Sequence, residues 1–151
     1  MEDILITIRR MELYDTASVA ELEADSFSEP WQQQDFANAV ADDKYIYLVA
    51  LDKDVVVGYA GCFVVADSSD ITNIAINKEY RRLGIGAKLL EILKEQAMLK
   101  GAKEIFLEVR ESNEAAIKLY YKSGFDKVGM RKNFYSKPTE NAIIMQNNLN
   151  G

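Results

Sequence analysis

The start of the chain carries two patterns of hydrophobic residues, one typical of a strand and one typical of a helix. Ile4, Ile6 and Ile8 recur at every second position, which predicts a β-strand. Over residues 15–27 the spacing becomes helical, and Asp15 stands where its carboxylate could cap the N-terminus of the helix. We therefore expect a strand followed by a helix.

Residues 28–76 combine short turns with runs rich in β-branched and aromatic side chains. A second short helix is expected after Pro30, because proline is tolerated in the first turn of a helix. Beyond it the pattern predicts three strands, separated by turns at residues 52–54 and 67–70. These strands cover residues 45–51, 55–65 and 71–76.

After residue 76 the pattern becomes helical again. A long helix is predicted to follow the Gly84-Ile85-Gly86 string and to run to Lys100, and Gly101 suits the residue that follows a helix C-terminus. A shorter helix over residues 113–122 is expected to stop at Gly124. The remaining hydrophobic runs predict strands over residues 105–109, 125–134 and 142–149.

The order strand, helix, strand at the centre of the chain predicts a βαβ unit with a parallel pair of strands. Antiparallel hairpins are expected on both sides of it. The predicted fold class is therefore α/β, a mixed sheet of about seven strands with about four helices. The 151 residues fit a single domain, 1–151, since a domain usually has roughly 100–200 residues.

Composition narrows the chemistry that such a fold could carry. The chain has 18 Lys and Arg against 24 Asp and Glu, a net charge of −6, which argues against nucleic acid as a partner but suits a basic peptide. It has no histidine, which excludes a histidine base or a histidine metal ligand, and no metal is expected. The single cysteine, Cys62, lies in an apolar run and is expected to be a buried thiol rather than a nucleophile.

No segment predicts export or membrane insertion. The N-terminal residues 1–5 lack the positive charge of a signal peptide, and the longest apolar run, residues 55–66, is too short to span a bilayer. We therefore expect a cytoplasmic protein that does not bind membranes. Nothing in the pattern predicts its oligomeric state.

A basic, glycine-containing segment lies between the strand over residues 71–76 and the long helix. Glycines let the backbone turn so that several amide groups converge, and the helix N-terminus and two arginines add positive charge. The segment therefore predicts a pyrophosphate site, although an ordinary strand-to-helix loop could have a similar sequence. Its residues are Arg81, Arg82, Leu83, Gly84, Ile85, Gly86 and Ala87.

Two common phosphate motifs are not matched by this segment. The Gly-x4-Gly-Lys-Ser/Thr string of a P-loop is absent. Gly84 and Gly86 could begin a Rossmann fingerprint, but Leu89 replaces its third glycine. A dinucleotide site is therefore the weaker alternative.

Three polar side chains follow at places where α/β proteins hold functional groups. Glu108 lies near the C-terminal end of a predicted parallel strand, where it could be a general base or could simply pair with Arg110. Asn113 is the expected cap of the next helix. On that helix Tyr120 shares a face with Ala116, so its phenol could reach a cleft or could serve only in packing.

Taken together, these motifs resemble the GNAT superfamily of N-acetyltransferases over nearly the whole chain. Arg81–Gly86 resembles the acetyl-CoA signature of the family, and Leu119–Phe125 resembles its Leu-Tyr-x-x-x-Gly-Phe string. Within the superfamily the chain is most similar to the ribosomal-protein alanine N-acetyltransferases of the RimI type. The segments that carry this closer similarity are Pro30–Trp31, Asn73–Ile76, Leu107–Arg110, Ser112–Asn113, Asn133–Tyr135 and Ala142–Met145.

The resemblance implies how acetyl-CoA would be bound. The backbone of Ile74, Ala75 and Ile76 would hydrogen-bond the pantetheine arm and thioester, as an added strand would. The segment 81–87 would hold the pyrophosphate, and Asn113 would contact the CoA chain.

The resemblance also implies the chemistry. An amine would attack the thioester directly, without a covalent enzyme intermediate, with Glu108 as general base and Tyr120 as general acid. The peptide that carries the amine would lie between Trp31 and Tyr135.

The implied substrate is the N-terminal α-amine, on alanine, of a small-subunit ribosomal protein. With a pKa of about 8, roughly a tenth of an α-amine is neutral at pH 7, so deprotonation costs roughly 1.4 kcal/mol, against roughly 4.6 kcal/mol for lysine. The acidic chain also favours encounter with a basic N-terminus. A lysine side chain or a small amine is the alternative substrate, and a CoA-binding domain without activity is a further alternative.

Overall fold

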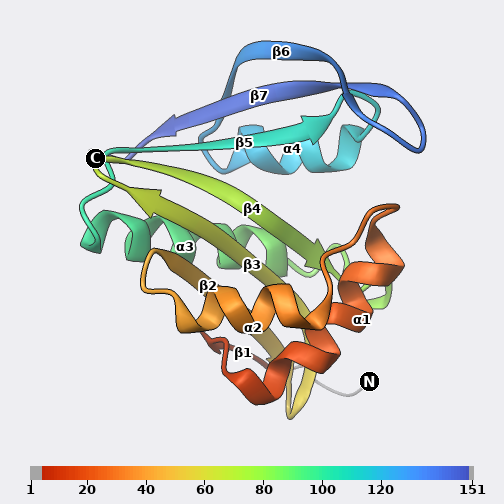
Figure 1. Ribbon diagram of the computed structural model, residues 1–151, viewed down its shortest axis with the longest axis vertical. Helices are drawn as coiled ribbons and strands as arrows, with labels where there is room; N and C mark the ends of the chain where they lie inside the picture. The colour runs from red at the N-terminus through yellow and green to blue at the C-terminus, as the bar shows by residue number, and fades with distance from the viewer. Residues whose placement is uncertain (1–4, 150–151) are drawn as a thin grey trace.

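The computed structural model describes residues 5–149, which fold around one sheet of seven strands (Figure 1). Ile4, which we assigned to the first strand, lies outside these residues. The strands are β1 (Ile6–Arg10), β2 (Tyr45–Asp52), β3 (Val55–Val65), β4 (Ser68–Ile76), β5 (Glu104–Arg110), β6 (Asp126–Tyr135) and β7 (Glu140–Asn148). The α-helices are α1 (Thr16–Ser26), α2 (Gln33–Ala41), α3 (Ile85–Leu99) and α4 (Glu114–Lys122).

The strand order is β1-β2-β3-β4-β5-β7-β6. Every neighbouring pair is antiparallel except β4 and β5, which are parallel and are joined through α3. The predicted α/β class, the parallel pair and the flanking hairpins are therefore confirmed. The order also places β7 between β5 and β6, so the last strand of the chain is not at the edge of the sheet.

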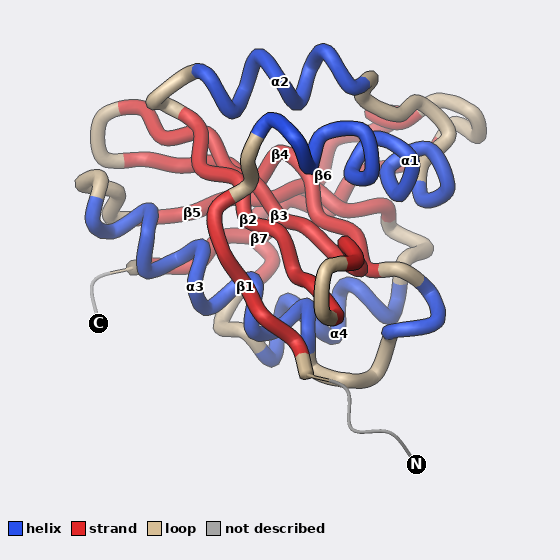
Figure 2. Tube along the Cα trace, turned by 90° about the horizontal axis from the view of Figure 1, so that it is seen from below, coloured by secondary structure: helices blue, strands red, loops and turns tan. Residues whose placement is uncertain are grey.

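The helices form two layers, one on each face of the sheet (Figure 2). Val19 of α1 and Phe36 of α2 are buried on one face, whereas Leu89 and Leu93 of α3 are buried on the other. The central strands are consequently covered on both faces. This explains why the apolar runs of β2 and β3 are nearly continuous. Successive side chains in these strands are all buried, and they contact the two helix layers in turn.

The parallel pair separates soon after it begins. β4 and β5 pair only where Ser68–Asp70 lie opposite Glu104–Phe106. Beyond this point they diverge, as Figure 1 shows between the green and cyan strands. Ile71–Ile76 of β4 and Leu107–Arg110 of β5 do not pair with each other, although each pairs with its other neighbouring strand. We call these two stretches the fork.

A β-bulge lies where the fork opens. Gly61 of β3 is paired with Asn73, but the next residue, Cys62, is paired with Ile71, so Thr72 is an extra residue in β4. A bulge bends its strand and increases the local twist. Because Thr72 comes two residues after the last β4 residue paired with β5, the bulge directs the rest of β4 away from β5.

Two predicted boundaries are wrong by a few residues. The second helix begins at Gln33 rather than directly after Pro30. The turn expected at residues 67–70 is shorter, because Ala66 adopts a positive φ of 54° and β4 already begins at Ser68.

Asp15 occupies the N-cap position of α1, as predicted, but its carboxylate makes no capping hydrogen bond to this helix. It ends a 3-10 turn, Leu13–Asp15, that precedes the helix. Its carboxylate accepts a hydrogen bond from the Glu12 backbone amide at 2.8 Å and pairs with the Arg9 guanidinium at 2.7 Å. The side chain is buried, so this pair fixes the connection between β1 and α1.

The Arg9–Asp15 pair predicts how stability depends on pH. Burial alone would raise the pKa of Asp15, but the hydrogen bonds from Arg9 and the Glu12 amide outweigh it and hold the pKa below its ordinary value. A carboxyl group with a lowered folded-state pKa stabilises the fold above its unfolded pKa of about 4, and this contribution is lost as the pH falls through the folded pKa.

We expect Asp15→Asn to lower the free energy of unfolding by about 1–3 kcal/mol at pH 7, because it leaves a partly buried guanidinium without its partner. Urea titrations at pH 7 and at pH 3 measure it, with the exposed Asp25→Asn on α1 as the control. The difference between Asp15→Asn and the parent protein should shrink at pH 3. An equal loss for both variants would show that the pair has no special role.

Candidate functional site

The predicted phosphate segment lies where the fork meets α3. After β4 the chain makes a 3-10 turn, Lys78–Tyr80, and then turns sharply into the helix. Arg82 has a φ of 65° and Gly84, which precedes the first helical residue, has a φ of 78°. Glycine adopts this left-handed conformation without strain, so the sequence places it where the turn requires it.

The backbone amides of this segment are free to bind a ligand. Within residues 5–149, no acceptor is recorded for the amides of residues 81–84. The first amides of α3 have no acceptor within the helix either, because none lies one turn before them. The side chains of Arg81 and Arg82 are exposed beside them. This combination of amides, helix dipole and guanidinium groups suits an anionic phosphate.

Gly86 has a packing role in addition to its predicted place in the phosphate segment. It is buried in the first turn of α3 and its φ lies outside the left-handed region. A Cβ at this position would lie 3.0 Å from Cδ2 of Leu119 in α4. Gly86 therefore lets α3 and α4 approach each other, which sets the position of Tyr120 relative to the phosphate segment.

The β4 arm of the fork offers an open strand edge. Ile74, Ala75 and Ile76 pair with β3 on one side, where Ala75 lies opposite Tyr59. On the side of β5 they have no partner strand in the described part of the chain. An extended ligand can pair with such an edge as an additional strand would.

On the β5 arm, Glu108 is exposed while Leu107 and Val109 are buried, as the predicted alternation requires. The alternative of a Glu108–Arg110 salt bridge is wrong. Arg110 pairs with Glu140 of β7 at 3.2 Å, and no ion pair of Glu108 is recorded within residues 5–149. The Glu108 carboxylate is therefore available to a substrate.

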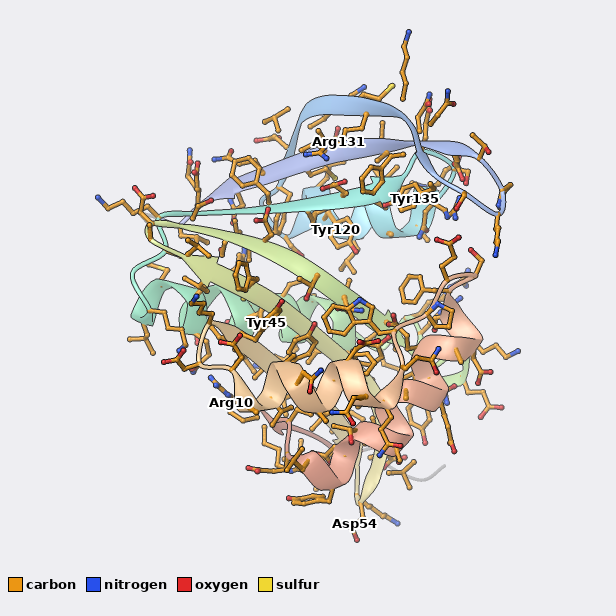
Figure 3. All side chains as sticks on the ribbon, viewed as in Figure 1. Arg10, Tyr45, Asp54, Tyr120, Arg131 and Tyr135 are labelled. Atoms are coloured by element: carbon orange, nitrogen blue, oxygen red, sulfur yellow. The ribbon has the colours of Figure 1, made fainter. Side chains whose placement is uncertain are left out.

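Tyr120 of α4 is buried except for 6% of its surface and packs against Phe125 with ring centroids 6.0 Å apart. No hydrogen bond of its hydroxyl is found among residues 5–149. Because no buried side-chain oxygen in that range lacks a partner, the hydroxyl is accessible to solvent. The adjacent Tyr121 is exposed. Figure 3 shows Tyr120 and Tyr135 near one another toward the open end of the fork. Burial, and to a smaller degree Tyr135, raises the pKa of the Tyr120 phenol.

Tyr135 lies within electrostatic range of both Tyr120 and Glu108. Burial and then the negative charge of Glu108 raise the pKa of Tyr135 to about 12. The structure thus brings together three residues from β5, α4 and β6 that are far apart in the sequence. Both phenols stay protonated at neutral pH, so each can donate a hydrogen bond.

Arg110 holds the hairpin that carries Tyr135. Its guanidinium lies over the Tyr135 ring, 4.5 Å from the centroid, and donates to the carbonyl oxygens of Ser136 and Pro138 at 3.0 Å each. The sequence indicates Arg110 as a partner of Glu108 and as part of the similar segment Leu107–Arg110, but gives it no role in the site. The alternation that places both on one face of β5 could have suggested a site residue, but not the contact with the hairpin.

Two loops from opposite ends of the chain meet over the fork. Oγ of Ser136, after β6, donates to Oε1 of Glu29, which lies between α1 and α2, at 2.8 Å. Trp31 follows in the same loop and packs against Phe36 and Tyr47, with ring centroids 5.3 Å and 6.1 Å away. No sequence pattern pointed to the Ser136–Glu29 contact.

Asn113 is confirmed as the cap of α4. Its Oδ1 accepts a hydrogen bond from the Ala116 amide at 3.2 Å. The side chain of Asn113 is exposed, and within residues 5–149 its amide nitrogen donates to no acceptor, so it can donate to a ligand.

A family model described as the acetyltransferase (GNAT) family matches residues 16–125. The chain belongs to this family. The crystal structure of the ribosomal-protein-S18-alanine N-acetyltransferase from Escherichia coli is similar with a TM-score of 0.87 and 32% identity, covering 96% of this chain and 94% of that chain.

Two curated relatives agree with this assignment. Ribosomal protein bS18 alanine N-acetyltransferases from Haemophilus influenzae and Escherichia coli K12 are 37% and 34% identical over 141 and 143 residues. These matches cover 91% and 92% of this chain and 95% of each relative. As a GNAT protein, the chain is an acetyl-CoA-dependent N-acetyltransferase, and acetyl-CoA rather than a dinucleotide is its co-substrate.

Three further features concern membrane-spanning helices, metal ligands and the single cysteine. None of the helices in residues 5–149 is long and apolar enough to cross a membrane. The same residues contain no cluster of three or more His, Cys, Asp or Glu side chains that could hold a metal ion. Cys62 is fully buried, and burial raises the pKa of its thiol to about 12, so it is a protonated structural thiol as expected.

The phosphate segment predicts a specific response to charge reversal. Arg82→Glu should weaken acetyl-CoA binding by about three- to ten-fold at low salt, because it places a negative charge beside the pyrophosphate. Calorimetry measures the affinity, with Lys103→Glu, an exposed lysine before β5, as the control. An equal loss for both variants, or detectable binding of NAD instead of acetyl-CoA, would contradict the assignment.

Proposed function

We propose that this enzyme acetylates the N-terminal α-amine of a ribosomal protein, with alanine as the acetylated residue. The observation that carries the proposal is the fork, where β4 has an open edge, β5 carries the exposed Glu108, and a hydrogen bond between Ser136 and Glu29 joins two loops. The names of the bacterial relatives, which match over more than nine-tenths of this chain, support the substrate.

In this proposal the β4 arm and the segment after it bind acetyl-CoA. The backbone of Ile74, Ala75 and Ile76 pairs with the pantetheine arm, and the amides of residues 81–87 receive the pyrophosphate. Asn113 donates its free amide group to the CoA chain. Acetyl-CoA supplies an activated acyl group with a thiolate as leaving group.

Glu108 is proposed as the general base. It removes a proton from the incoming ammonium group, either directly or through a water molecule. At pH 7 this costs roughly 1.4 kcal/mol for an α-amine of pKa about 8, which a solvent-exposed carboxylate can support.

Tyr120 is proposed as the general acid, which protonates the departing thiolate. Its raised pKa keeps the proton available at every working pH, but makes the transfer less favourable than for an ordinary phenol of pKa about 10. The hydroxyl therefore stabilises the developing thiolate by donating a hydrogen bond before the proton moves.

The peptide is proposed to enter between Trp31 and Tyr135, beneath the contact between Ser136 and Glu29. Both rings are partly buried, so each offers an apolar wall with an exposed edge. The net charge of −6 favours encounter with a basic N-terminus.

Removal of the acid or the base should affect chemistry more than binding. Tyr120→Phe and Glu108→Gln should each lower turnover by about 10²–10⁴-fold while acetyl-CoA affinity stays nearly unchanged. Turnover of Glu108→Gln should recover in part at higher pH, where the amine loses its proton unaided. Steady-state kinetics from pH 6 to pH 10 measure this, with the exposed Tyr121→Phe as the control. Full activity of Tyr120→Phe would reduce Tyr120 to a packing residue.

Removal of the Tyr135 side chain should instead affect peptide binding more than chemistry. Tyr135→Ala should raise the KM for the peptide several-fold and leave acetyl-CoA affinity intact, since it removes a contact on one side of the fork only. Tyr14→Ala, an exposed tyrosine outside the site, provides the control. A loss of acetyl-CoA affinity equal to the loss of peptide affinity would argue against this placement.

The substrate itself is tested with two basic peptides. One has a free N-terminal alanine and no lysine, and the other has a blocked N-terminus and an internal lysine. Mass spectrometry should find acetylation of the first at a much higher rate. Faster acetylation of the blocked peptide would instead support a lysine side chain as substrate.

A further inference from the structure

A buried carboxylate lies beneath the loop that carries Trp31. Glu23 of α1 is only 2% exposed, and no Lys or Arg side chain forms an ion pair with it within residues 5–149. Its Oε2 accepts hydrogen bonds from the Trp31 backbone amide and from Nδ2 of Asn73, each at 3.0 Å, and its Oε1 accepts one from the Tyr59 hydroxyl. Three donors therefore replace water around this carboxylate.

The network continues into the bulge of β4. Oδ1 of Asn73 accepts from the Tyr47 hydroxyl at 2.6 Å, and the same hydroxyl lies 2.6 Å from Oγ1 of Thr72. Tyr47 belongs to β2 and reaches β4 by lying across Gly61 of β3, where a Cβ would come within 2.1 Å of the ring. Gly61 is thus required for the network to span three strands.

Glu23 connects the two parts of the proposed site. Its hydrogen bond to Trp31 is the one recorded for the backbone amides of residues 28–31. Asn73 immediately precedes the open edge Ile74–Ile76. The same carboxylate therefore ties the loop on the peptide side to the strand on the acetyl-CoA side.

We propose that Glu23 is a positioning residue that holds the Trp31 loop at a fixed distance from β4, and so aligns the peptide amine with the thioester. The alignment of amine and thioester rests on the proposed function, whereas the position of the loop does not. An accurately fixed distance matters here because direct transfer requires the two reacting groups to meet in one geometry.

The number and kind of donors explain why a carboxylate is needed. All three partners donate, and an ionised carboxylate accepts with both oxygens and donates nothing. Glutamine is nearly isosteric, but its amide nitrogen would face a donor and leave at least one buried group unsatisfied. Burial and the charge of Glu23 raise the pKa of Tyr59, so this partner remains a donor at neutral pH.

Trp31 is the single tryptophan of the chain, so its fluorescence reports on this loop directly. In Glu23→Gln we expect the emission to shift to longer wavelength and quenching by acrylamide to increase, because the loop loses its backbone anchor. Glu21→Gln removes the same charge at an exposed site of α1 and should leave both signals unchanged. Circular dichroism checks that each variant is folded.

Kinetics provide the second readout. In Glu23→Gln, kcat/KM for an alanine peptide should fall about ten-fold, which corresponds to about 1.4 kcal/mol, while the Kd of acetyl-CoA stays unchanged. Glu23→Asp keeps an acceptor for the buried donors but withdraws it from Trp31 by one methylene group. Glu23→Asp should therefore show both the altered Trp31 fluorescence and the lower kcat/KM, and it tests the proposal even if Glu23→Gln does not fold.

The outcomes separate this proposal from the proposed function. If the fluorescence of both Glu23 variants matches that of the parent protein, the positioning role is wrong, whatever amine is acetylated. An equal loss of acetyl-CoA and peptide affinity would also overturn it, because that result indicates a general structural role. A changed fluorescence with lysine as the acetylated group would refute the substrate and retain the positioning role.

Discussion

The separation of β4 from β5 is the feature on which the rest of the site depends. The two strands pair over three residues each and then diverge at the bulge of Thr72. Backbone groups that leave a ladder need other partners, and the open edge of β4 offers such groups to an extended ligand.

The other residues of the proposed site are placed around the fork by contacts between elements. Gly86 lets α4, which carries Tyr120, approach α3. The strand order brings β6 beside β7, and Arg110 then holds the hairpin with Tyr135 near Glu108. On the opposite arm, Glu23 anchors the Trp31 loop. Arg110 therefore fixes the hairpin on the β5 side, and Glu23 fixes the loop on the β4 side. The hairpin and the loop contact each other through Ser136 and Glu29.

Much of the fold could be predicted from the sequence, because it depends on local patterns. The apolar runs of β2 and β3 and the left-handed glycines after α3 and α4 are examples, since Gly101 and Gly124 both have a φ of 97°. The fork could not be predicted, because a bulge depends on the register between two strands rather than on periodicity. Glu23 was missed for a related reason: its donors come from a loop and two strands that only the folded chain brings together, and a glutamate on a helix normally faces solvent.

Hydrogen–deuterium exchange on binding of a CoA–peptide conjugate tests most directly whether both substrates meet in the fork. The conjugate joins CoA through an acetyl bridge to a peptide that begins with alanine. Exchange should slow in four segments on both sides of the opening, namely residues 28–32, 74–76, 82–87 and 133–137. Slowing that is confined to one arm, or that lies outside these segments, would contradict the fork as the common site.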